Sequence, residues 1–418
     1  MAHSYCGIDF GTTNSTIGLA PVGQEPRLLA VEGEQVTIPS ALFFSFEDHR
    51  THFGRAAVAE YLDGAEGRFM RALKSILGST LMDERTQIGR ERVSFQQLIG
   101  TFIGHLRARL AKAGETPEKV VLGRPVFFVD DDEAADRKAQ SQLEEVARAQ
   151  GFAHVEFQFE PVAAALHFER RLEREVLALV VDIGGGTSDF SVLRLSPKAR
   201  KRVDRREDIL STSGVHVGGT DFDKLLSIAK VMPQMGMGSA TRDGKRQMPL
   251  WYFHEMATWH RINQLYTPQI IRDVRELERE AAEPQKLVRF RRLLESRSGH
   301  RLAGSVEAAK IELSEAEAAA IKLDEDGISL SVAVTRGEFE LATLELTQKI
   351  EVAIEDALLA AGAKAEAIEM VILTGGGALV PHVRRAAIAR FGAAAVADAD
   401  QFGAVGLGLA ADAQVRFG

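Results

Sequence analysis

The chain has 418 residues, which is long for a single hydrophobic core and favours two or more domains. It carries 51 Lys and Arg against 59 Asp and Glu, a formal net charge of −8, which argues against nucleic acid or a membrane surface as a partner. The single cysteine, Cys6, excludes a disulfide within the chain, and no apolar run approaches the ~20 residues of a membrane span. A strand pattern starts at Tyr5, so we expect no signal peptide and a cytoplasmic protein.

Strand-like and helical patterns alternate along the chain, which predicts an α/β fold. Apolar strand runs occur at 176–181 and 370–373, and amphipathic helical patterns occur at 133–150 and 340–361. The stretch 224–305 differs, because it has few β-branched runs and long charged helical patterns. We therefore expect a helical insertion there.

A short pattern occurs twice, once at 7–15 and once at 181–189. Each copy consists of a strand, an aspartate, a Gly-rich turn, threonine, and then a second strand. One such turn is weak evidence, because hairpins often use Asp and Gly for geometry alone. Two copies in one chain predict two similar lobes whose hairpin tips face each other.

These two turns contain the groups that a nucleoside triphosphate and its magnesium ion require. Glycine lets the backbone N–H groups approach phosphate closely, and threonine adds hydroxyl groups. Asp9 and Asp182 stand where each strand meets its turn, so we expect them to hold the waters of Mg²⁺. The predicted phosphate-binding residues are Gly11, Thr12, Thr13, Asn14, Gly184, Gly185, Gly186 and Thr187.

Two common nucleotide-binding motifs are missing from the sequence. It has no G-x-x-x-x-G-K-[ST] run, and Gly184 to Gly186 do not continue into a G-x-G-x-x-G pattern. The repeated turn is therefore evidence for a different class of nucleotide site.

The pair of turns resembles the two phosphate loops of the DnaK-type heat-shock protein 70 family, within the actin-like ATPase superfamily. Further segments follow in the order of that family. The run 72–78 resembles its catalytic-lysine segment, which implies Lys74, and 159–165 resembles its helix start with a glutamate that senses the γ-phosphate, which implies Glu160. Residues 123–126 match the strand that carries the family's switch proline, and the resemblance assigns its relay arginine to Arg137.

The second half of the chain continues the resemblance on the adenosine side. The runs 218–223, 307–310 and 373–381 are similar to family segments that contact the nucleoside. Chaperones of the family place an arginine over adenine where this chain has Ile311, and a serine where it has Gly377. The residues implied to bind nucleotide on this side are Gly218, Gly219, Asp221, Glu307, Lys310, Ile311, Gly375, Gly376 and Gly377.

The resemblance implies the two-lobed actin and heat-shock ATPase fold, with duplicated ribonuclease H-like domains and the helical insertion in the second lobe. We expect lobe I at 1–172, with a small subdomain at about 40–115, and lobe II at 173–398, with the insertion at about 224–305. A C-terminal helix at 399–418 is expected to return to lobe I. The resemblance is to YegD-like members, which lack the peptide-binding domain, and we expect that domain to be absent here.

The implied reaction is slow attack of water on the γ-phosphate of ATP, with ATP or ADP and Mg²⁺ bound. Lys74 would offset developing charge, and Thr187 would contribute to the catalytic turn. Asp182, Asp189 or Glu160 would orient the water, and the sequence leaves the choice open. A protein client or a co-chaperone is an expected partner.

Three other functions remain open on the sequence alone. A nucleotide-sensing module with little hydrolysis would use the same residues. An actin-like filament protein would polymerise with ATP. A sugar kinase would share the fold but would need a substrate-binding acid and base, which we do not identify.

Overall fold

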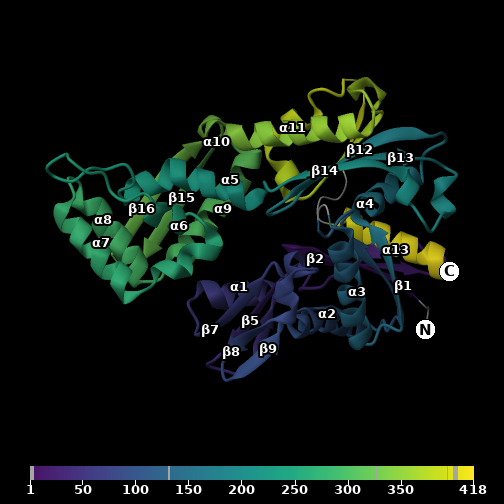
Figure 1. Cartoon of the computed structure of the whole chain (residues 1–418), viewed down its shortest axis with the longest axis horizontal. Helices are drawn as coiled ribbons and strands as arrows, with labels where there is room; N and C mark the ends of the chain where they lie inside the picture. The colour runs from purple at the N-terminus through teal and green to yellow at the C-terminus, as the bar shows by residue number, and fades with distance from the viewer. Residues whose placement is uncertain (1–3, 130–131, 326, 393, 399–402) are drawn as a thin grey trace. The chain divides into compact units, whose positions relative to one another are not determined.

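The molecule contains two sheets that match each other in the order and the directions of their strands (Figure 1). The computed structural model describes residues 4–129, 132–325, 327–392, 394–398 and 403–418. The chain divides into two compact units. Unit 1 comprises Met1–Val215, Val352–Ala378 and Ala387–Gly418, and unit 2 comprises His216–Glu351 and Leu379–Ala386.

The first sheet of unit 1 has the strand order β11-β10-β1-β2-β3, and β4 also pairs with β2. β2 is antiparallel to β1, whereas β10 is parallel to β1 and β11 is parallel to β10. The strands are β1 (Ser4–Phe10), β2 (Asn14–Pro21), β3 (Arg27–Leu28), β4 (Thr37–Pro39), β10 (Lys119–Arg124) and β11 (His154–Phe159).

The second sheet repeats this arrangement in the order β14-β13-β12-β17-β18. β12, β13 and β14 follow one another in the chain and pair in antiparallel fashion. On the other side of β12, β17 pairs with it in parallel, and β18 pairs in parallel with β17. The strands are β12 (Val176–Ile183), β13 (Ser188–Leu195), β14 (Ile209–Val215), β17 (Met370–Thr374) and β18 (Ala395–Asp398). The predicted α/β fold with a duplicated domain is therefore confirmed.

The central strands are apolar because they are covered on both faces. In β12, the run from Ala178 to Val181 is buried throughout. Three short 3₁₀ helices, η3 (Ala199–Lys201), η4 (Arg206–Asp208) and η8 (Ala365–Ala367), lie in the connections around this sheet.

Helix α13 (Ala404–Phe417) packs closely against β1, β2 and α4 (Glu160–Glu169) (Figure 1). Glycine makes this approach possible, because a Cβ at Gly7 would lie 2.4 Å from Ala410 N, and one at Gly408 would lie 1.9 Å from Ala163 O. The helix was predicted from residue 399, and residues 399–402 lie outside the described residues.

A smaller β-rich part of unit 1 lies between β4 and β10 in the chain. β5 pairs with β6 and β7, and β8 pairs with β9. Helix α2 begins with a capping box between Ser94 and Gln97, which fixes its start. Helix α3 (Glu133–Ala149) comes later, between β10 and β11. The elements of the β-rich part are β5 (Ala41–Ser45), β6 (Thr51–Phe53), α1 (Gly54–Leu62), β7 (Gly67–Arg71), η1 (Leu73–Ile76), η2 (Thr80–Asp83), β8 (Arg85–Ile88), β9 (Glu91–Ser94) and α2 (Phe95–Lys112).

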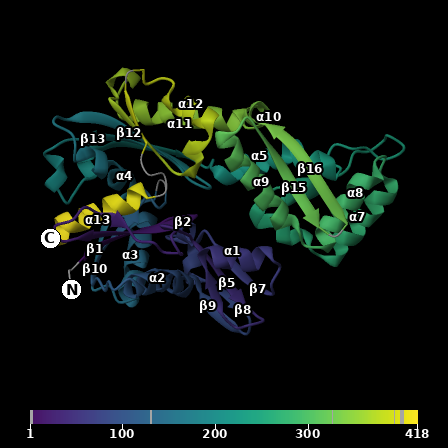
Figure 2. The same ribbon diagram turned by 180° about the vertical axis from the view of Figure 1, so that it is seen from behind.

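Unit 2 is built from helices around one long hairpin, β15–β16, with α9 packed along it (Figure 2). Phe253 and Phe290 are fully buried in its core, with ring centroids 5.1 Å apart. The elements that begin here are α5 (Gly219–Leu226), η5 (Ser227–Val231), η6 (Met232–Met235), α6 (Trp251–Met256), η7 (Trp259–Leu265), α7 (Pro268–Glu280), α8 (Pro284–Glu295), α9 (Gly299–Glu315), β15 (Ala318–Glu325), β16 (Ile328–Thr335), α10 (Arg336–Ala342) and α11 (Leu344–Ala360).

Three elements near the end of the chain each have residues that belong to unit 1 and residues that belong to unit 2. They are α11, η9 (Gly376–Leu379) and α12 (Pro381–Ile388). Within the described residues, none of the helices combines the length and apolar character that crossing a bilayer requires.

Candidate functional site

Asp9 and Asp182 occupy equivalent positions in the two sheets of unit 1. Each is the second-last residue of the first strand, β1 or β12, and each precedes a Gly-rich turn. Asp9 is paired in register with Thr16 on β2, and Asp182 with Asp189 on β13. The duplication therefore places one carboxylate at the end of each central strand.

The first turn is tight and is anchored from outside the motif. A Cβ at Gly11 would lie 2.1 Å from the carbonyl oxygen of Asn14, so only glycine fits there. The Ser40 hydroxyl donates to the Gly11 carbonyl at 2.6 Å, and the Ser40 N–H donates to the Thr13 carbonyl at 2.8 Å. Ser40 thereby fixes the turn, although the sequence motif does not include it.

The two turns meet. A Cβ at Gly185 would lie 2.3 Å from Cγ2 of Thr13, so the tips are in van der Waals contact and depend on glycine at this point. In the second turn, the Gly184 N–H donates to the Thr187 carbonyl at 2.9 Å, and Gly186 and Thr187 are exposed. The structure thus brings together the two repeats, which begin 174 residues apart in the sequence.

Lys74 and Glu160 form a buried ion pair within unit 1. Lys74 lies in η1, whose preceding residue Ala72 has a left-handed φ of 57°, and only 8% of the Lys74 side chain is exposed. Glu160 is the first residue of α4, followed by Pro161 in the first turn. The Nζ of Lys74 donates to Oε1 of Glu160.

Electrostatic coupling shows that these groups form one cluster. Burial and repulsion from Glu160 raise the pKa of Asp9 to about 7. Burial, Asp189, Glu160 and Asp9 raise the pKa of Asp182 to about 8. Burial alone would lower the pKa of Lys74, but Glu160, Asp9 and Asp182 together raise it.

The loop after β17 lies against the end of β12. A Cβ at Gly375, which has a φ of 80°, would lie 2.6 Å from Oδ1 of Asp182, and one at Gly377 would lie 2.2 Å from Cγ2 of Ile183. Gly376 begins the short helix η9. The glycines at 375 and 377 therefore let this loop touch the strand that carries Asp182.

In unit 2, Lys310 on α9 is bound to the start of α5. Its Nζ donates to Oδ2 of Asp223 at 2.9 Å and to the Gly219 carbonyl at 3.3 Å. Burial raises the pKa of Asp223 to about 6, against the opposing charge of Lys310. Asp221 caps α5 by accepting from the Gly218 N–H at 3.0 Å.

Several predicted residues lie at the surface. Glu307 and Ile311, one turn apart on α9, are exposed, and 60% of Ile311 is accessible. Arg137 lies at the surface of α3 and pairs with Glu133 at 3.0 Å. Asp189 is also exposed and accepts from the Thr187 hydroxyl at 3.4 Å.

Sequence reasoning missed a buried arginine in unit 1. Arg124, the last residue of β10, donates from Nη2 to both carboxylate oxygens of Asp136 at 2.8 Å. Asp136 falls on the same helical face as Leu143 and the other buried residues of α3, whereas the adjacent Arg137 does not. That periodicity was the available signal.

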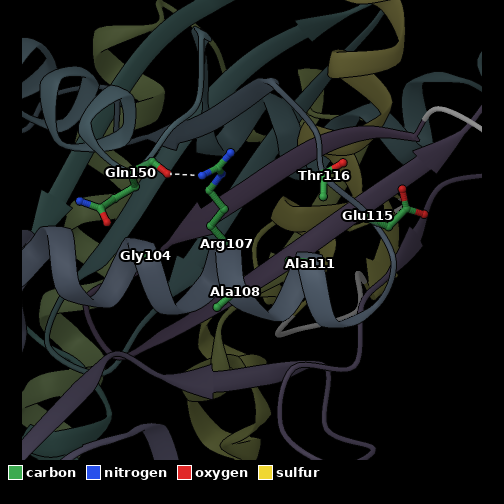
Figure 3. A pocket seen from close by; sticks show the side chains of 7 residues that line it. All are labelled: Gly104, Arg107, Ala108, Ala111, Glu115, Thr116 and Gln150. Carbon is green, nitrogen blue, oxygen red and sulfur yellow. Dashed lines mark hydrogen bonds between the residues drawn. The ribbon is translucent and has the colours of Figure 1, made fainter.

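A cavity of about 360 Å³ lies elsewhere in unit 1, beside α2 (Figure 3). Arg107 lines it and donates to the Gln150 carbonyl at 2.6 Å, and Glu115 and Thr116 follow the helix at its other end. None of the predicted site residues lines this cavity.

The donors of the carboxylate cluster suit a hard divalent cation. The cluster contains one positive charge, that of Lys74, and four carboxyl groups, those of Asp9, Asp182, Glu160 and Asp189. A cation that prefers oxygen ligands would therefore relieve the repulsion among the carboxylates. No group of three or more His, Cys, Asp or Glu arranged as direct metal ligands occurs in the part of the chain that the structure describes.

Comparison with known families gives a match over most of the chain. The family model described as Hsp70 protein matches residues 5–232 and 286–418. Between the two matched stretches, residues 233–285 contain most of η6, all of α6, η7 and α7, and the first residues of α8.

Proposed function

Because this chain belongs to the Hsp70 family, whose members are ATP-binding, chaperone-type ATPases, we propose that it binds ATP with Mg²⁺ and hydrolyses it slowly as a nucleotide switch. The observation that carries the proposal is the cluster in unit 1, where two facing Gly-rich turns lie with Asp9, Asp182 and the Lys74–Glu160 pair. A protein client or co-chaperone is the proposed partner, and the cytoplasmic location stays a prediction.

The two turns would hold the phosphates. Their backbone N–H groups and the hydroxyls of Thr12, Thr13 and Thr187 are suited to phosphate oxygens. Gly375 to Gly377 would contact the nucleoside, as the family resemblance implies. These assignments are supported by the glycine-dependent close approaches in unit 1.

Magnesium, when bound, would neutralise charge on the phosphate oxygens. Asp9 and Asp182 would hold it through its waters. The raised pKa values of both carboxyls describe the protein without a cation, and a nearby divalent charge would lower them again.

The chain's own groups would serve the chemical step as follows. A water oxygen attacks the γ-phosphorus, the bond from that phosphorus to the leaving ADP oxygen breaks, and the water gives up a proton. Lys74 would offset charge on the transferring group, because its three carboxylate neighbours outweigh the effect of burial and keep it protonated. Asp182, Asp189 or Glu160 would orient the water and accept its proton.

The test separates binding from hydrolysis. Isothermal titration with ATP and with ADP, each with and without Mg²⁺, should show one site per chain that is tighter with the metal. Radiolabelled ATP in excess of protein, followed over hours, should release inorganic phosphate. No binding at millimolar nucleotide would contradict the whole proposal, whereas binding without phosphate release would favour the nucleotide-sensing alternative.

A further inference from the structure

Arg124 ties together the chain segment that follows β10. Besides Asp136, its Nε donates to the Pro125 carbonyl and its Nη2 to the Val126 carbonyl, both at 3.0 Å, and its Nη1 donates to Gln140. Only 6% of the residue is exposed. Such a planar fork fixes direction as well as distance, which a lysine would not do.

Asp136 completes this clamp from α3. Its Oδ1 accepts the N–H of Phe128 at 2.7 Å in addition to the guanidinium of Arg124. The charge of Arg124 is therefore already neutralised, and its donors are directed to protein acceptors. We conclude that Arg124 does not contact phosphate and acts through its neighbours.

The neighbour that matters is Glu160. Arg124 is paired in register with Phe159, and its guanidinium carbon lies 5.3 Å from the centre of the Phe159 ring. Phe159 is the residue immediately before α4, so it sets the start of the helix that carries Glu160. On the same strand, a Cβ at Gly123 would lie 3.2 Å from Cγ of Glu160, which shows how closely the end of β10 packs against that side chain.

We propose that the Arg124–Asp136 clamp is a positioning device for the reaction, which holds the end of β10 and Phe159 so that Glu160 keeps Lys74 directed at the carboxylate cluster. This inference rests on the proposed ATPase function. It assigns to Arg124 the link between α3 and the site that the sequence resemblance assigned to Arg137.

The test compares substitutions of the clamp residues, Arg124 on β10 and Asp136 on α3, with a substitution of Arg137, the residue next to Asp136. Removing only one partner of a buried pair destabilises a fold, so both charges are removed together in Arg124→Met with Asp136→Leu. Arg124→Lys retains the charge but not the fork. Arg137→Met is the matched control, because Arg137 follows Asp136 directly and lies at the surface. Circular dichroism melting verifies that each variant is folded.

The expected result is a split between turnover and binding. A small displacement of a catalytic group costs up to about 100-fold in rate, so we expect the double variant to lose about 10- to 100-fold in kcat. Its Kd for ADP, measured by titration, should stay within about twofold, since ADP lacks the γ-phosphate that Lys74 serves. Arg124→Lys should fall between the double variant and wild type, and Arg137→Met should behave as wild type. Normal kcat in a folded double variant, or an equal loss in Arg137→Met, would overturn the inference.

If the wild-type protein fails to hydrolyse ATP, the proposed ATPase function is refuted, but the clamp itself can still be tested by a second measurement. Acetic anhydride acylates lysines that are released from ion pairs, and mass spectrometry measures the rate at each site. Lys310, paired with Asp223, is the internal reference. Faster acylation of Lys74 relative to Lys310 in the double variant, with Arg137→Met unchanged, supports the clamp. An unchanged ratio in the double variant refutes it.

Discussion

At the scale of single residues, Lys74 is the side chain on which the proposed chemistry depends most. We expect Lys74→Ala to lower the rate of ATP hydrolysis by about 100-fold or more, because a preorganised charge at the transferring group is lost. Phosphate release under single-turnover conditions measures it. Lys138→Ala is the control, since that lysine is exposed and pairs with Asp83. Equal rates in the two variants would leave the buried Lys74 with a structural role only.

Asp182 gives a prediction for the pH dependence of stability in the nucleotide-free and metal-free protein. Its carboxyl has a pKa near 8 when folded against an ordinary value of 3.8, so folding takes up a proton between these values. Its stabilising contribution is therefore complete below pH 4 and is lost as the pH rises through about 8.

Asp182→Asn removes that loss because the amide stays neutral. We expect the melting temperature of wild type to fall more steeply from pH 6 to pH 9 than that of the variant, which should be the more stable protein at pH 9. Asp63→Asn, at an exposed position, is the control for loss of one charge. Parallel melting curves for wild type and Asp182→Asn across this range would show that the carboxyl is ionised in the fold.

The sequence made predictable those parts of the site that are encoded by short contiguous motifs. Each Asp-Gly-Thr turn is contiguous in the chain, so the two hairpin tips and their meeting followed from the repeat itself. Ser40 could not be found this way, since it anchors Gly11 from 29 residues away and its residue type is common in loops. Arg124 was overlooked for a different reason, because resemblance by order pointed to Arg137 while the buried face of α3 pointed to Asp136.

At the scale of elements, the packing of α13 depends on glycine. Gly408→Ala would place a Cβ 1.9 Å from the Ala163 carbonyl, and overpacking of this kind costs about 1–3 kcal/mol in the free energy of unfolding. Gly304→Ala is the matched control, because Gly304 lies in α9 with no atom within 4 Å of its Cβ position. There we expect a gain of about 0.5–1 kcal/mol from helix propensity. Urea unfolding should therefore give opposite signs, and a gain at both sites would contradict the close packing.

Helix α9 provides a test of the proposed nucleoside contacts. Ile311 is exposed, so an arginine fits there without disturbing the core. We expect Ile311→Arg to tighten ADP binding by about 0.5–2 kcal/mol through stacking of the guanidinium on adenine. Titration calorimetry measures it, with Glu312→Arg on the same exposed helix as the control. Equal affinities in the two variants would show that adenine does not lie over residue 311.

At the scale of the whole molecule, the predicted nucleotide ligands are divided between the two compact units. A ligand at 100 times its Kd adds about 2.7 kcal/mol to the folded state. Because two units need not unfold together, calorimetry in the absence of nucleotide is expected to resolve more than one transition. If residues of both units bind the nucleotide, MgADP should raise both transitions. A shift confined to one of them would restrict the site to one unit.

The packing of α13 on β1 also has a consequence for biosynthesis. Strand β1 is made well before α13, the helix that covers it, and β12 is made before β17 and β18, which extend its sheet. Unit 1 cannot complete its core until α13 has left the ribosome, whereas most of unit 2 is one continuous stretch that emerges earlier. Contacts so distant in sequence make folding slow, and the apolar faces of β1 and β2 stay exposed during that interval. A nascent chain of this protein is therefore itself a candidate for protection by other chaperones until α13 has been made.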